Sequence, residues 1–122
     1  MRILIADDEP LFAHALAALL EADGRVEVVG RALDGQEAVN LARALEPDLV
    51  LMDLSMPGMD GFDATEQLTA NGGPRVLVLT GSDDPADVAR ARSAGAAGYL
   101  TKDRIAETLV EAILAAGGAE TG

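Results

Sequence analysis

Five side chains that could bind a metal ion or a phosphoryl group each follow a short apolar run of the sequence. They are two adjacent acids, a third acid, a hydroxyl and an ammonium, namely Asp7, Asp8, Asp53, Thr80 and Lys102. The apolar runs before them have the length of buried strands. Because the carboxyl ends of parallel strands share one edge of a sheet, we expect the five side chains to meet there. Three carboxylates, a hydroxyl and a cation in one crevice predict a site for Mg²⁺ and a phosphoryl group.

Each of these residue types would have a separate role in phosphoryl transfer. Like charges a few ångströms apart repel, so the three carboxylates need a proton or a cation between them. A carboxylate beside Mg²⁺ can attack phosphorus and become an aspartyl phosphate, while Lys102 neutralises the transferred group and Thr80 donates a hydrogen bond to it. Lys102 is the only lysine among the nine basic residues of the chain. A compact ammonium on a flexible stem suits a small anion better than a planar guanidinium does.

Strands and helices that could position these residues alternate five times along the chain. Apolar runs predict strands at residues 3–6, 25–31, 48–52, 76–79 and 97–100. Periodicity and capping residues predict helices that begin near Pro10, Asp34, Gly61, Asp84 and Ile105. The alternation favours an α/β class, namely a flavodoxin-like doubly wound (βα)5 fold with a five-stranded parallel sheet in the order 2-1-3-4-5. In that order the first and third strands, which lead to Asp7-Asp8 and Asp53, border the ligand crevice.

Composition limits the class of protein. A length of 122 residues suits one domain, and the absence of cysteine excludes disulfides and thiolate metal sites. The formal net charge of -12 argues against direct nucleic-acid binding by this segment, because such binding relies on clustered basic residues. No run approaches the roughly 20 apolar residues of a membrane span. We expect a cytoplasmic protein without a membrane partner.

Four motifs resemble those of response-regulator receiver domains, which act in two-component signalling. They are DDEP at 7–10, DLSMPGMDG at 53–61, TG at 80–81 and YLTKD at 99–103, and the resemblance extends along essentially the whole chain. It implies that Asp53 is the phosphoacceptor and binds Mg²⁺ directly with Asp8. Asp7 would contribute to the metal site through water, and Ser55 through its backbone carbonyl.

The same resemblance implies the remaining roles and the partners. Thr80 and Lys102 would contact the phosphoryl group, and Tyr99 would be the aromatic switch residue whose rotamer reports activation. The phosphodonor would be a sensor histidine kinase, and the response could include a phosphorylation-dependent homodimer. Such a protein modifies and dephosphorylates only itself, so it is not an ordinary enzyme.

The run GYLTKD at 98–103 is similar to the NarL/FixJ type, whose output domain is a helix-turn-helix. That likeness implies transcription regulation through an output domain that is not in this chain. We expect a receiver domain at 1–116, with 117–122 as a C-terminal tail or the start of a linker. A fragment of a longer regulator and a stand-alone receiver are both compatible with these boundaries, and the first is favoured.

Other interpretations remain for comparison. A haloacid-dehalogenase-like phosphatase would need an acid where Ser55 stands, and a flavodoxin-like electron carrier would need a phosphate loop where the acids of 7–9 lie. Asp7 and Asp8 taken alone could be helix caps, and Tyr99 could be core packing. A pseudo-receiver that acts as a phosphorylation-independent interaction module is the alternative function, although no acceptor, metal acid or lysine is missing.

Overall fold

The computed structural model describes residues 1–54, 56, 61–81 and 84–117, which form a five-stranded sheet flanked by helices. The strands are β1 (Arg2–Ala6), β2 (Glu27–Ala32), β3 (Leu49–Asp53), β4 (Arg75–Thr80) and β5 (Gly98–Thr101). The helices are α1 (Pro10–Glu21), α2 (Gly35–Leu45), α3 (Gly61–Thr69), α4 (Pro85–Ser93) and α5 (Ile105–Gly117). Two single 3₁₀ turns, η1 (Ala70–Gly72) and η2 (Lys102–Arg104), complete the described elements.

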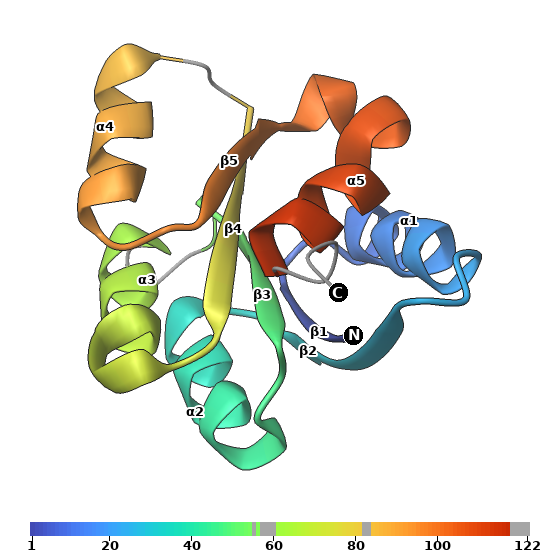
Figure 1. Cartoon of the computed structure of the whole chain (residues 1–122), viewed down its shortest axis with the longest axis horizontal. Coiled ribbons are helices and arrows are strands. Elements are labelled where there is room, and N and C mark those ends of the chain that lie inside the picture. Colours follow the sequence, from blue (N-terminus) through green and yellow to red (C-terminus); the bar gives the residue numbers. More distant parts are fainter. Residues whose placement is uncertain (55, 57–60, 82–83, 118–122) are drawn as a thin grey trace.

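The strands lie in the order β2-β1-β3-β4-β5, and all four neighbouring pairs are parallel. Helices α1 and α5 cover one face of the sheet, and α2, α3 and α4 cover the other (Figure 1). This is the flavodoxin-like arrangement that the sequence predicts. Each crossover is right-handed, and the chain moves from β1 to β2 in one direction and from β2 to β3, β4 and β5 in the other, so the connecting helix α1 lies on one face and α2, α3 and α4 lie on the opposite face.

Two apolar clusters, one on each face, hold the layers together. Leu16 and Leu20 of α1 and Ile113 of α5 pack against alternate residues of the central strands, such as Ile5 and Leu51. On the opposite face the intervening residues of the same strands pack against α2, α3 and α4. Both sets of strand side chains are buried, which explains why the runs in the sequence are continuously apolar and do not alternate.

Helix α2 begins where Asp34 and Glu37 predict a capping box. The Asp34 carboxylate accepts a hydrogen bond of 2.8 Å from the Glu37 backbone N–H. The Glu37 carboxylate reaches back to the N–H of Leu33, at 2.7 Å, and so bonds one residue before the N-cap. Both carboxylates thus accept hydrogen bonds from backbone N–H groups at the start of the helix. In a standard capping box Glu37 would accept from the N–H of the N-cap residue Asp34, whereas here it accepts from that of Leu33.

The observed boundaries differ from the predicted ones by a few residues at the ends of elements. Helix α1 ends at Glu21, earlier than the glycine at position 24, and α5 includes Gly117, which we expected in the tail. The rest of the predicted tail, 118–122, lies outside the described residues.

Candidate functional site

Three carboxylates gather at the carboxyl edge of the sheet, as the strand order requires. Asp7 follows the last residue of β1, Asp8 comes next, and Asp53 is the last residue of β3. One carboxylate oxygen from each residue lies within 4.8 Å of the others. Asp7 and Asp53 are buried, whereas Asp8 is exposed, so the cluster is open to solvent on the Asp8 side.

The Asp7 carboxylate is buried, but only one of its two oxygens accepts a hydrogen bond from a described residue. Its Oδ1 accepts a hydrogen bond of 2.8 Å from the Glu9 backbone N–H. Its Oδ2 is buried and accepts no hydrogen bond from any described residue. Burial raises the pKa of Asp7 from 3.8 to about 6; the Glu9 N–H opposes this rise, the Asp53 charge adds to it, and the Lys102 ammonium also opposes it.

These observations fit a hard cation. A buried carboxylate oxygen without a donor loses the hydration it has in the unfolded chain, and two further carboxylates lie close by. Mg²⁺ takes oxygen ligands from one or two carboxylates and keeps several waters. The exposed Asp8 side leaves room for those waters. The donor set therefore suits Mg²⁺ better than it suits a structural helix cap.

Lys102 is the cation that the sequence predicts beside the three acids. It is the first residue of η2, directly after β5. Its Nζ lies 3.1 Å from Asp53 Oδ2, in an ion pair whose side chains are 24% exposed for Lys102 and 2% for Asp53. This pair joins the end of β5 to the end of β3 across the intervening β4. The ammonium thus lies beside the acidic cluster.

Thr80 lies on β4, the strand next to β3, and Tyr99 lies on β5, the strand beyond it. Thr80 is buried at the end of β4, level with Thr101 of β5. The Leu54 N–H donates to the carbonyl of Leu79, at 3.1 Å, which ties the turn after Asp53 to the end of that strand. Tyr99 is half-buried and packs against the core cluster under α2, α3 and α4, so part of its role is packing. Ser55 lies outside the described residues.

Two residues that contact the site, Arg31 and Phe12, are not predicted from the sequence. Arg31 donates from Nε to the backbone carbonyl of Asp7, at 3.2 Å, and so anchors the turn after β1 to β2. The ring of Phe12 faces the Lys102 ammonium, with 4.5 Å from Nζ to the ring centroid. The sequence offers one signal for Phe12, since it lies one helical turn after Asp8 at the start of α1. For Arg31 it offers none.

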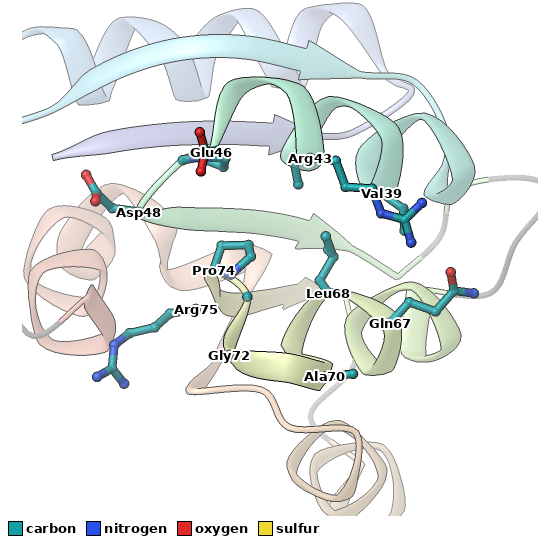
Figure 2. A pocket seen from close by; sticks show the side chains of 13 residues that line it. Val39, Arg43, Glu46, Asp48, Gln67, Leu68, Ala70, Gly72, Pro74 and Arg75 are labelled. Atoms are coloured by element: carbon teal, nitrogen blue, oxygen red, sulfur yellow. The ribbon is translucent and has the colours of Figure 1, made fainter.

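A hollow of about 670 Å³ lies at the opposite edge of the sheet. Its lining includes Asp48 and Arg75, at the starts of β3 and β4, and Arg43 and Glu46 at the end of α2 (Figure 2). In Figure 2 Glu46, Asp48 and Arg75 lie at the end where the strands begin, whereas Arg43 and Gln67 lie between α2 and α3. The lining mixes acids and bases, and none of the three clustered acids takes part. This hollow therefore does not contain the predicted phosphoryl site.

Comparison with known proteins identifies the class to which this fold and this acidic cluster belong. The family model "Response regulator receiver domain" matches residues 3–114, and the chain therefore belongs to that family. The chain is similar to the nitrate/nitrite response regulator protein NarP of Escherichia coli, with 44% identity over 115 residues, which are 93% of this chain and 54% of that protein. It is similar also to the transcriptional regulatory protein LiaR of Bacillus subtilis, with 44% identity over 121 residues, which are 98% of this chain and 57% of that protein.

The solved structures agree with this placement. The receiver domain of the response regulator NarL from Mycobacterium tuberculosis superimposes with a TM-score of 0.91 at 40% identity, covering 96% of this chain and 95% of that one. The NarL type that the run at 98–103 predicts is thus confirmed by the relatives. The chain spans about half the length of the curated relatives it matches. Within the part that the structure describes, no helix is both long and apolar enough to cross a membrane.

Proposed function

We propose that this receiver domain is a phosphorylation-activated switch, and that Asp53 accepts a phosphoryl group from the phosphohistidine of a sensor histidine kinase. The observation that carries the proposal is the position of the Asp53 carboxylate, which is buried among two further acids and paired with Lys102 at 3.1 Å. A carboxylate used only for structure would not need this combination of acids and cation.

The step we propose is an in-line displacement at phosphorus. An oxygen of Asp53 forms the new P–O bond while the P–N bond of the phosphohistidine breaks, and the electron pair of that bond returns to the imidazole. Asp7, Asp8 and Asp53 would hold Mg²⁺, with the Ser55 carbonyl implied by the family resemblance. Bound Mg²⁺ would supply positive charge to the phosphoryl oxygens.

The cation and the hydroxyl of the site would then couple the chemistry to a change of shape. When the phosphoryl group forms on Asp53, its negative charge attracts the Lys102 ammonium, which already lies in the crevice. Thr80, at the end of the adjacent strand, would donate to a phosphoryl oxygen. Because these residues end β4 and lie directly after β5, their movement would reshape those strand ends, and Tyr99 of β5 would adjust its rotamer.

The output that we propose is transcription regulation in the cytoplasm. LiaR is named a transcriptional regulatory protein and NarP a response regulator, and the matched residues make up only 57% and 54% of their lengths, which leaves room for an output domain in such proteins. The receiver itself has a formal net charge of -12 and would act through protein contacts, such as a phosphorylation-dependent homodimer, and not through DNA. It would modify only itself and would turn over no external substrate.

Intact mass after incubation with Mg²⁺ and acetyl phosphate tests the proposal. The wild type should gain one alkali-labile phosphoryl group, and Asp53→Asn should gain none. Asp63→Asn is the matched control, because Asp63 is an exposed acid in the first turn of α3 and should leave the gain intact. An unmodified wild type would favour the phosphorylation-independent interaction module, and a stable label on serine or threonine would refute the mechanism.

A further inference from the structure

The Lys102 ammonium has two neighbours that come from different parts of the fold. One is Asp53 at the end of β3, at 3.1 Å from Nζ, and the other is the ring of Phe12 in α1, at 4.5 Å to the centroid. An aromatic face attracts a cation within about 6 Å of its centroid. The ammonium therefore has an attractive contact in addition to its ion pair.

The two partners differ in how firmly they are held. The Lys102 side chain is 24% exposed and carries four rotatable bonds, so it can leave the crevice for solvent. Phe12 is partly buried and packs against the core cluster under α1 and α5. Packing thus holds the Phe12 ring in place, and the ring can restrict the motion of the Lys102 side chain. The partly exposed lysine, in contrast, would not hold the ring.

We propose that Phe12 is a positioning residue, whose ring keeps the Lys102 ammonium in the crevice while the anion beside it changes from the Asp53 carboxylate to a phosphoryl group. The functional half of this inference rests on the proposed function. A cation that is already ordered needs less reorganisation when negative charge arrives than one recruited from solvent. Phe12 would touch neither the metal nor the phosphoryl group, and it would act only through Lys102.

A purely structural Phe12 would behave differently from a positioning one. Phe12→Leu keeps an apolar side chain in the core but removes the ring face, and Phe12→Tyr keeps the face. The chain contains a matched pair for comparison, since Arg90 lies over the ring of Phe62 at 4.2 Å. Phe62 packs on the opposite face of the sheet from Phe12. Phe62→Leu is therefore a control that removes a ring–cation contact elsewhere.

The contact between Phe12 and Lys102 can be measured in the unphosphorylated protein. Because Lys102 is the only lysine in the chain, its NMR signal needs no further assignment. Labelling with ¹³C-lysine gives one side-chain signal, and the ring current of Phe12 should move its ε-methylene protons upfield. We expect this shift in the wild type, in Phe12→Tyr and in Phe62→Leu, and its loss in Phe12→Leu. Identical lysine shifts in the wild type and Phe12→Leu would overturn the contact.

The functional role can be measured by a double-mutant cycle with Mg²⁺ and beryllofluoride, which mimics the phosphoryl group. Phe12→Leu should weaken beryllofluoride binding by about two- to fivefold, the factor that corresponds to an ordinary cation–ring contact. The same substitution in a Lys102→Ala background should have no effect, because the residue on which it acts is gone. Phe12→Tyr should bind as the wild type does. Phe12→Met, which also lacks a ring, repeats the test if Phe12→Leu does not fold.

The outcomes separate this inference from the proposed function. An equal loss with and without Lys102 would show that Phe12 acts through general structure and would refute the positioning role. Full binding by Phe12→Leu would refute it as well, with the proposed function intact. A wild type that binds no beryllofluoride would refute the proposed function, and the positioning role with it, while the lysine signal would still decide whether the contact exists.

Discussion

Replacing Asp7 with asparagine should stabilise the metal-free protein, although we propose that Asp7 helps to hold Mg²⁺. The wild-type carboxylate is buried, and one of its oxygens accepts no hydrogen bond from the described residues. Asparagine keeps an acceptor for the Glu9 N–H and turns the other position into an amide that can donate toward Asp53. The substitution therefore removes a buried charge and a charge repulsion with little loss of hydrogen bonding.

The pKa of Asp7 sets the size and the pH dependence of this effect. Its rise from 3.8 to about 6 means that the folded protein disfavours the ionised form. At roughly 1.4 kcal/mol for each pH unit, the ionised carboxylate destabilises the metal-free fold by about 2 to 3 kcal/mol. Because the folded pKa is the higher one, this penalty is fully present above about pH 6 and disappears below about pH 4, where both states are protonated. For a domain of this size it corresponds to about 10 °C in Tm.

Thermal melts of the wild type and Asp7→Asn at pH 7.5 and pH 4, with EDTA and with Mg²⁺, test the reasoning. We expect Asp7→Asn to melt higher in EDTA at pH 7.5, with the difference lost at pH 4. Mg²⁺ should raise the wild-type Tm and change the variant far less, because ligand binding stabilises only the state that binds. Asp8→Asn is the matched control: Asp8 is exposed, so its removal should weaken Mg²⁺ binding with a change of only about 0.5 kcal/mol in metal-free stability. A less stable Asp7→Asn in EDTA, or a gain that persists at pH 4, would refute the argument.

Two further substitutions test the conformational response to phosphorylation and the stability of the fold. Lys102→Ala should still be phosphorylated at Asp53, because the nucleophile and the acids remain, but it should lose the conformational response. Sedimentation at saturating beryllofluoride should show self-association of the wild type only, and association of the variant would contradict this role. Gly95→Ala should destabilise the fold by about 1 to 3 kcal/mol in urea melts, because Gly95 has φ of +102° and a Cβ there would meet the side chain of Thr69. Gly24→Ala, with open space around it, is the control and should change stability by roughly 0.5 kcal/mol or less; equal losses would refute the backbone argument.

The overall fold and the main site residues could be predicted from the sequence because both depend on local patterns. Continuous apolar runs indicate buried parallel strands, and the residues that follow those runs must share one edge of the sheet. That geometry is sufficient to bring Asp7, Asp8 and Asp53 together with Lys102, whatever the details of packing. Helix starts follow from short-range signals, whereas the strand order comes from the known topology of five-stranded doubly wound folds. The roles of these residues remain predictions until phosphorylation is measured.

Only the tertiary structure decided how these groups differ from one another. Asp7 and Asp8 are adjacent and identical in type, yet one is buried and the other exposed, because the chain turns at the end of β1. The raised pKa of Asp7 follows from that burial. The contact of Phe12 with Lys102 likewise depends on how α1 docks on the sheet. Periodicity assigns a residue to a face, but burial and cross-element contacts depend on side-chain packing between segments far apart in sequence, which no local pattern encodes.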